Sequence, residues 1–363
     1  MIVILLLIVC GSLFATTPPA EFAEHVIDLT GGSQAVIADL NKDGKPDIIA
    51  IAGGEKELVW FENPAWQRHV LASELSGMTN VAAWDIDGDG IPELVLAHEF
   101  AADPKSSLGI LSVLKHGVDP RQPWKITEID RIPTSHLLRW ADLKGDGRRT
   151  LVNAPLSGIT PGKTPLVSYK PGAWIRETIS EENEGPVHGM NIAKWDAESA
   201  EAILTAGVGG IHLFRLGLEG ECLRTEITKI GSTDVAAGSL GRREERIPFL
   251  AALDPTPTTQ ISVYRPEGKI PWKRQVIVDS LVPGGTILTA DLNADRNDEI
   301  ISGGYIFYAL NAKGDRWSKS VLDSDGAGAA NCVVADLNAD GKTDIVCIGA
   351  ASLKWYENRG VRK

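Results

Sequence analysis

The 363-residue sequence has little of what several protein classes require. Four cysteines are too few for a disulfide scaffold, and three methionines with no long amphipathic apolar run argue against a helical bundle. Lys and Arg number 36 against 48 Asp and Glu, and the resulting formal net charge of −12 disfavours a nucleic-acid partner. The chain does have 43% hydrophobic residues, and its 37 Gly and 20 Pro follow no collagen-like pattern. This composition excludes disorder and collagen.

Strongly apolar sequence is confined to the N-terminus. Residues 1–14 are almost wholly apolar and are followed by Ala15, a pattern typical of a secretory signal peptide at residues 1–15. No Lys or Arg precedes the run, so a mis-assigned start codon is the alternative. No other segment is apolar enough to cross a bilayer. We therefore expect residues 16–363 to form a secreted or periplasmic mature chain.

The mature chain keeps three cysteines, an odd number that gives no disulfide framework. Cys332 and Cys347 are placed to face each other across a hairpin. We expect the pair to be two small buried hydrophobic residues rather than a bonded pair, with Cys222 separate from both.

One phrase recurs seven times: a short apolar run, an Asp, a turn rich in Asp, Asn and Gly, and a β-rich run. It reads AVIADLNKDGKPDIIAI from Ala35 and VAAWDIDGDGIPELVLA from Val81, and the copies from Met190 and Val235 are degraded. The first loop residues, roughly 50 residues apart, are Asp39, Asp85, Asp142, Asp196, Ser239, Asp291 and Asp336.

Two further phrases flank each copy, a short strand with a basic or aromatic start before the loop and an aromatic or apolar strand after it. Four short strands in roughly 50 residues are typical of one propeller blade. The sequence therefore predicts an all-β, single-domain, seven-bladed β-propeller over 16–363. Its ring would be closed by pairing the N-terminal outer strand His25–Leu29 with the last third strand, Leu353–Glu357.

Four loops between the first and second strands of a blade carry carboxylates or amides at alternate positions. Oxygen ligands this dense would repel one another without a cation, and Ca²⁺ takes 6–8 of them. Asx-turns that favour Asp, Asn and Gly are the alternative. Arg296 weakens blade six, while Lys144 and Thr150 argue against a site in blade three. The predicted structural Ca²⁺ ligands are Asp39, Asn41, Asp43 and Asp47; Asp85, Asp87, Asp89 and Glu93; Asp291, Asn293, Asp295 and Glu299; and Asp336, Asn338, Asp340 and Asp344.

These loops resemble the FG-GAP and VCBS repeat families, the Ca²⁺-loop propellers that include the integrin α-subunit head. The resemblance covers the whole mature chain. It implies a fold rather than a function, because unrelated activities share this scaffold.

Three histidines fall at the channel face of consecutive blades. His98 ends a second strand next to Glu99, while His136 and His188 begin or precede first strands, with Arg139 three residues after His136. Such imidazoles suit a Zn²⁺ or similar ion, or an acid–base pair, and the alternative is three unrelated loop histidines. Other blades offer polar residues at what we take as matching positions, which would suit a polyhydroxylated ligand or ordered water: Gln34, Asn80, Asp234, Thr286 and Asn331.

Several segments are similar to the propeller part of aldos-2-ulose dehydratase: Ser135–Asp142, Leu151–Leu156, Val187–Met190 and Ala97–Glu99. The resemblance implies a carbon–oxygen lyase that dehydrates keto-sugars with metal ions bound. His136 and His188 would then bind metal or act as base, His98 and Glu99 would be ligand or acid, and Arg139 would orient the enolate oxygen. The alternatives are a non-catalytic Ca²⁺-binding propeller that binds glycan or protein, and a polysaccharide lyase. The sequence leaves open the exact sugar, whether the chain is an enzyme, and its oligomeric state.

Overall fold

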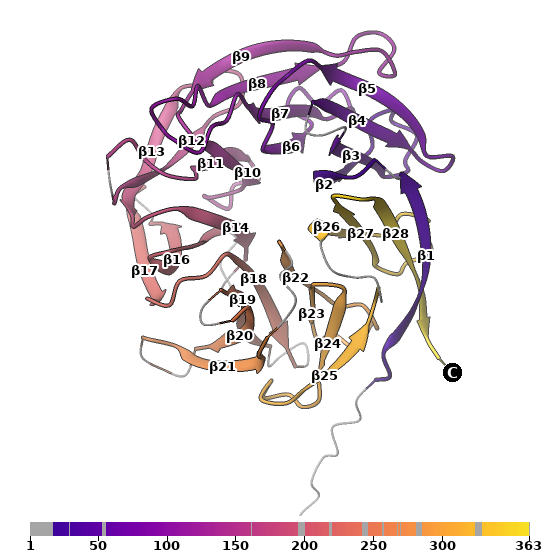
Figure 1. The fold of residues 1–363 in the computed structure, drawn as a ribbon, viewed down its shortest axis with the longest axis vertical. Helices are drawn as coiled ribbons and strands as arrows, with labels where there is room; N and C mark the ends of the chain where they lie inside the picture. The colour runs from indigo at the N-terminus through magenta and orange to yellow at the C-terminus, as the bar shows by residue number, and fades with distance from the viewer. Residues whose placement is uncertain are drawn as a thin grey trace, which may run out of the picture.

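The structure, a computed structural model, describes residues 17–362 apart from short gaps at 29, 53–55, 161, 195–199, 218–219, 242–245, 256–257, 267, 269, 281–284 and 324–328. The predicted signal peptide and Asp196 lie outside the described residues. Every element of the described chain is a strand, and the strands form seven four-stranded antiparallel sheets (Figure 1). The protein is a seven-bladed β-propeller, with one blade for each repeat.

The blades are numbered in chain order from the innermost strand outward. Blade one is β2 (Gly32–Ala38), β3 (Asp47–Ala52), β4 (Glu57–Glu62) and β5 (Gln67–Ser73), and blade two is β6 (Asn80–Trp84), β7 (Glu93–His98), β8 (Ile110–Lys115) and β9 (Lys125–Arg131). Blade three is β10 (Ser135–Ala141), β11 (Thr150–Pro155), β12 (Thr164–Tyr169) and β13 (Arg176–Asn183), and blade four is β14 (Val187–Ala193), β15 (Ala202–Gly207), β16 (Gly210–Leu216) and β17 (Cys222–Thr228).

The remaining three blades complete the ring. Blade five is β18 (Asp234–Leu240), β19 (Ile247–Asp254), β20 (Gln260–Arg265) and β21 (Lys273–Val278), and blade six is β22 (Ile287–Ala290), β23 (Glu299–Ser302), β24 (Tyr305–Ala309) and β25 (Trp317–Val321). Blade seven is β26 (Ala329–Ala335), β27 (Asp344–Gly349), β28 (Leu353–Val361) and, as its outer strand, β1 (Ala20–Asp28). In this last sheet His25 pairs with Trp355 and Ala20 with Val361, so the two ends of the chain share one blade.

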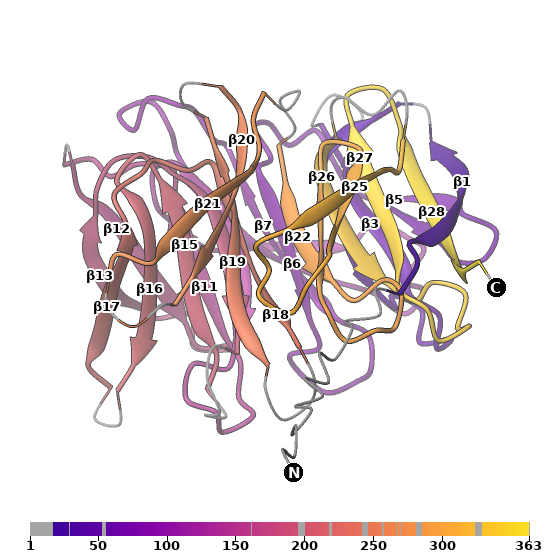
Figure 2. The same cartoon turned by 90° about the horizontal axis from the view of Figure 1, so that it is seen from below.

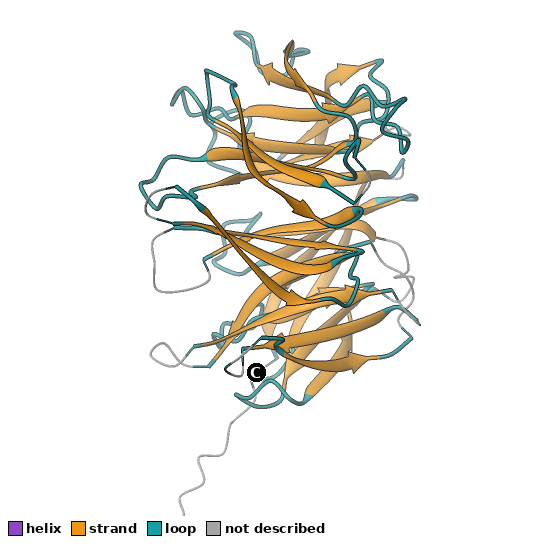
Figure 3. Cartoon of the chain, turned by 90° about the vertical axis from the view of Figure 1, so that its left-hand side faces the viewer, coloured by secondary structure: helices purple, strands orange, loops and turns teal. Residues whose placement is uncertain are grey.

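The hydrophobic core is divided among the interfaces between blades. The described residues form seven clusters of buried side chains, and each cluster takes its residues from two neighbouring blades. The second strand of a blade therefore has both faces covered, which is why β3, β7 and β15 are buried at every residue. Side views show the blades packed face to face around the ring, with loops at both ends of the strands (Figures 2 and 3).

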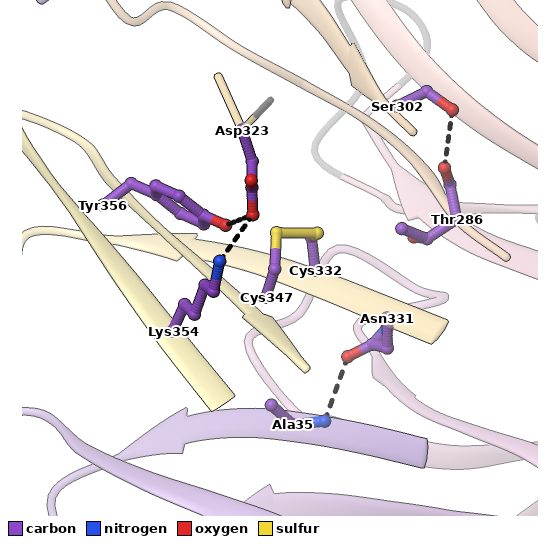
Figure 4. The surroundings of a disulfide bond; sticks show 9 residues. All are labelled: Ala35, Thr286, Ser302, Asp323, Asn331, Cys332, Cys347, Lys354 and Tyr356. Atoms are coloured by element: carbon purple, nitrogen blue, oxygen red, sulfur yellow. Dashed lines mark hydrogen bonds and ion pairs between the residues drawn. A yellow bond between two sulfur atoms is a disulfide. The ribbon is translucent and has the colours of Figure 1, made fainter. Parts of the chain in front are cut away.

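Polar side chains on the innermost strands join one blade to the next. The Oε1 atom of Gln34 accepts the Val81 N–H at 2.6 Å, and the Oδ1 atom of Asn80 accepts the Leu138 N–H at 3.1 Å. Asn331 closes the ring in the same way by accepting the Ala35 N–H at 3.0 Å (Figure 4). We call these residues the interblade clips. Because Gln34 and Asn80 are buried, each clip satisfies a backbone amide that water cannot reach.

The two cysteines of the last hairpin are bonded, contrary to the expectation of two unbonded hydrophobic residues. Cys332 on β26 lies directly opposite Cys347 on β27, with their Cα atoms 4.1 Å apart (Figure 4). Strand pairing thus supplies the close approach that a disulfide needs. Cys222 is free and half-buried. No helix among the described residues is long and apolar enough to span a membrane.

Candidate functional site

A cavity of about 580 Å³ runs along the axis of the ring and is lined by the innermost strands of all seven blades. His136 and Arg139 reach it from β10, His188 from β14 and Asp234 from β18. Three of the five predicted catalytic residues therefore line one cavity, together with a carboxylate from the next blade. This group is the candidate site.

Both histidines occupy an extra residue in their strand. Ser135 pairs with Pro155 and Leu137 with Ala154, so His136 has no partner in the ladder; His188 lies in the same way between Val187 and Gly189. Such a bulge turns a side chain out of the regular alternation and re-aims it. Ser33 and Ala330 are the equivalent extra residues in blades one and seven.

This register corrects the comparison between blades made from the sequence. Gln34, Asn80 and Asn331 do not match the two histidines; they match Leu137 and Gly189, one residue later. Blades three and four therefore lack a polar clip residue and carry a bulged histidine instead. The polar side chains that were predicted to surround a ligand instead join neighbouring blades. Blades three and four differ, because each has a histidine on the cavity wall and no polar residue at the clip position.

The cavity wall disfavours the protonated form of both imidazoles. Burial lowers the pKa of His136 to about 4, with further contributions from His188 and Arg139, and burial lowers the pKa of His188 as well. His136 Nδ1 is buried with no hydrogen-bond partner, and the ring lies 5.8 Å from that of Phe100. His188 is the more exposed of the two. A neutral imidazole open to the cavity can accept a proton.

A guanidinium and a carboxylate complete the group. Arg139 donates through one Nη to Asn80 Oδ1 at 3.0 Å and to the Leu138 carbonyl at 2.8 Å, and its charge acts on Asp234. The Asp234 carboxylate accepts the Val235 and Ile287 N–H groups, each at 2.9 Å, so it clips blade five to blade six. Burial raises the pKa of Asp234 to about 6 despite these bonds.

Gly189 allows the carboxylate to lie beside the histidine strand. A Cβ atom at this position would come within 2.6 Å of the Asp234 Cα atom and 2.7 Å of its Oδ1 atom. Sequence reasoning did not assign a role to Gly189 and grouped Asp234 only with the polar ring. The available signal was that Asp234 is the single carboxylate among amide and hydroxyl residues.

The structure places His98 and Glu99 outside the candidate site, which corrects their grouping with the other histidines. Neither lines the axial cavity. His98 is 5% exposed, and its Nε2 atom lies 3.0 Å from Ser112 Oγ on the neighbouring strand β8, while Glu99 accepts a hydrogen bond from Ser76 Oγ. The physical reason is that β7 is a second strand, one strand spacing further from the axis than β6.

The axial cavity does not provide the donor set of a transition-metal site. Among the described residues, three His, Cys, Asp or Glu side chains bring ligand atoms within 4.8 Å of one another only at Asp85, Asp87 and Asp89. The Arg139 guanidinium also disfavours a second cation beside His136. The histidines therefore do not fit the predicted Zn²⁺ site, and no step is derived through such an ion.

The acidic loops have a common structure at the opposite end of the strands. The last predicted ligand of each is buried and accepts the N–H group of the second loop residue: Leu40 to Asp47, Ile86 to Glu93, Leu292 to Glu299 and Leu337 to Asp344, all at 2.8–3.0 Å. These carboxylates anchor the base of the loop and keep lone pairs for a cation.

The first Asp of the loop organises the turn, with or without a complete ligand set. Asp39 accepts the Asp43 and Gly44 N–H groups, and Asp142 accepts the equivalent amides in blade three, where Lys144 and Thr150 replace ligands. The turn therefore forms from Asx hydrogen bonds alone. Arg296 adopts φ of 71° where the other loops have Gly, a strained conformation for a side chain. The one cluster of three carboxylates within reach of a single metal ion among the described residues is in blade two, at Asp85, Asp87 and Asp89. Binding of Ca²⁺ by any of the loops stays a prediction.

Comparisons with known proteins support the fold and identify an FG-GAP-like repeat in one part of the chain. The FG-GAP-like repeat family model matches residues 29–96, which span blade one and part of blade two. A search of curated protein sequences found no match.

Three solved structures are similar. A lectin from Agrocybe aegerita that recognises non-reducing terminal N-acetylglucosamine has a TM-score of 0.54 at 13% identity, over 82% of this chain and 82% of that chain. BBS1N in complex with ARL6DN has a TM-score of 0.61 at 10% identity, over 93% and 100%. The rhamnogalacturonan lyase YesW has a TM-score of 0.51 at 13% identity, over 94% and 75%. At these identities the likeness shows the fold alone.

Proposed function

We propose that this chain is a carbon–oxygen lyase that dehydrates a small keto-sugar by β-elimination at the histidine end of the axial cavity. The observation that carries the proposal is the departure of blades three and four from the pattern of interblade clips. Both have lost the polar clip residue, at Leu137 and Gly189, and both present a bulged histidine to the cavity. The loss of two structural contacts at the same place as two imidazoles supports a role other than holding the ring together.

The residues of the site can share the steps of an elimination. His188 removes the proton next to the sugar carbonyl, and the C–H electron pair enters the enolate, from which it forms the new C=C bond as the β C–O bond breaks. The β-hydroxyl leaves with the electrons of its C–O bond and takes the proton from the His188 imidazolium, so the products are an enone and water. Arg139 stabilises the oxyanion of the enolate. His136 stays neutral beside Arg139 and so adds no competing positive charge.

Two further lines of support concern the substrate class and the location. That the sugar is a keto-sugar rests on the resemblance of Ser135–Asp142 and Val187–Met190 to a dehydratase propeller, and one structural neighbour is a rhamnogalacturonan lyase. Secretion is supported by the Cys332–Cys347 disulfide, because such bonds persist mainly in oxidising compartments.

The test is turnover of 1,5-anhydrofructose followed by the ultraviolet absorbance of the enone. We expect His188→Ala and Arg139→Met each to lower kcat/KM by about 10²–10⁴-fold, the usual range for a lost general base or oxyanion partner. His98→Gln, which changes a histidine outside the cavity, is the matched control and should stay within a few-fold of wild type. Absence of enone from the wild-type protein rejects a dehydratase for this substrate.

A second candidate is a non-catalytic propeller that binds glycan or protein. It is favoured by three exposed apolar side chains, Leu108, Ile159 and Val208, on the second-to-third connections of blades two, three and four, at the end of the ring where the histidines lie. Sugar rings and protein surfaces both pack on such residues. Saccharide binding by calorimetry that is unchanged in His188→Ala, without any turnover, would favour this candidate over the lyase.

A further inference from the structure

The three best acidic loops differ in the residue that the third strand presents to them. In blade one the third strand ends at Glu62, and in blade seven the residue at the same register is Glu357. In blade two that position is Lys115, because Leu94 pairs with Leu114 just as Ile48 pairs with Phe61. The loop with most carboxylates thus faces a lysine, while its two counterparts face a further acid.

The lysine lies among the carboxylates of its own blade. Lys115 Nζ is 2.6 Å from Glu93 Oε1 and also contacts Asp87 Oδ2. Asp85, Asp87 and Asp89 bring their oxygens within 4.8 Å of one another, and among the described residues no other three His, Cys, Asp or Glu side chains do so. Two of the four predicted ligands of this loop, Asp87 and Glu93, are therefore already paired with an ammonium group of the chain itself.

Blade one has a different arrangement around its loop. Glu62 accepts a hydrogen bond at 2.9 Å from the Nδ2 atom of Asn41, a predicted ligand, and no lysine contacts Asp39, Asn41 or Asp43 among the contacts of the described residues. Glu62 itself is paired with Arg121, whose Nε donates to it at 2.9 Å, so in blade one the chain's own cation lies on the third-strand acid and not on Asp39 or Asp43. In blade two the cation instead contacts the predicted loop ligands Asp87 and Glu93 directly.

We propose that Lys115 is the resident cation of the blade-two loop, so that this loop closes without a divalent ion although its sequence matches the Ca²⁺ pattern most fully. A divalent ion would have to displace an ammonium group that is tethered to the adjacent strand and held at an effectively high local concentration. In blade seven Lys342 contacts a single predicted ligand, Asp340, at 2.5 Å, and in blade one no lysine of the described residues contacts a predicted ligand, so a divalent ion, where this propeller binds one, would enter blade one before blade two.

The experiment is a count of bound Ca²⁺ per chain, by calorimetry and by elemental analysis after dialysis, on the chelator-treated full chain. Lys115→Met should bind one Ca²⁺ more than wild type. If the variant has a lower Tm than wild type without Ca²⁺, adding Ca²⁺ should restore the Tm. Lys170→Met, the same register position in blade three, is the matched control and should gain no ion, because Lys144 and Thr150 replace ligands there.

A second variant tests the proposal even if Lys115→Met does not fold. Asp87→Asn in the wild-type background should leave the number of bound ions unchanged, because no divalent ion occupies that loop. Loss of one ion in Asp87→Asn would overturn the proposal, since the loop would then bind metal with Lys115 in place. A Lys115→Met protein that is folded but binds no additional ion would overturn it as well.

Discussion

At the scale of single residues, the histidines of this chain differ in what faces their rings. His25 stacks on Trp355 at 4.6 Å between ring centroids and contacts a glutamate, an arrangement that packs an outer strand. His212 is 3% exposed and has its Nε2 atom 2.7 Å from an Nη atom of Arg224, a cation. His136 faces a cavity. The position of each ring in its blade separates the packed histidines from those that line the cavity.

His212 should make the fold sensitive to acid. Burial, with Arg224 beside it, lowers its pKa in the folded protein to about 4, below the ordinary 6.5. As pH falls from 6.5 to 4, the His212 imidazole becomes protonated in the unfolded chain but stays neutral in the folded chain. The free energy of unfolding therefore decreases by up to about 3 kcal/mol. His212→Gln keeps an acceptor for Arg224 and lacks this loss. Urea unfolding at pH 7, 5.5 and 4 should show a steeper fall for wild type; parallel curves would contradict the assignment.

At the scale of elements, the sequence predicts the strands and the loops but not their register. Second strands are apolar at nearly every residue because both of their faces are covered, so they are readily recognised. The bulges that hold His136 and His188 leave no such mark, because one inserted residue does not alter the local composition. A one-residue error in aligning the blades therefore made the clip residues look equivalent to the histidines.

Substituting an interblade clip residue should lower the free energy of unfolding more than substituting the residue next to it. Gln34 is 4% exposed, and its amide both accepts from the Val81 N–H and donates to the Val81 carbonyl. Gln34→Met keeps the volume and leaves both backbone groups buried without a partner, which should lower the free energy of unfolding by roughly 2–3 kcal/mol. Ser33→Ala is the matched control, because Ser33 Oγ has no hydrogen-bond partner. Urea denaturation measures both, and equal stabilities would refute the clip role.

At the scale of the whole molecule, the sequence repeats are enough to predict the number and order of the blades in the ring. Three phrases, each occurring seven times in one order, require seven equivalent sheets, and closure of those sheets removes most of their edges. The grouping of His98 with the other two histidines was wrong because the repeats predict only the end of the strand at which a residue lies. They do not predict how far that strand lies from the axis of the ring. The repeats place His98 at the end of β7, and only the assembled ring shows that this end is shielded from the cavity.

The closure itself gives the last prediction. The nine residues of β1 cover the outer edge of β28, so deleting residues 1–28 should expose a long strand with unpaired backbone groups. We expect the truncated protein to form dimers or larger aggregates in size-exclusion chromatography with light scattering, and to unfold at a lower temperature. Deleting only residues 1–16 is the control, because β1 then remains in place. A monomeric 1–28 deletion with an unchanged Tm would mean that the other six blades hold the ring without β1. The shared blade would then contribute no closure.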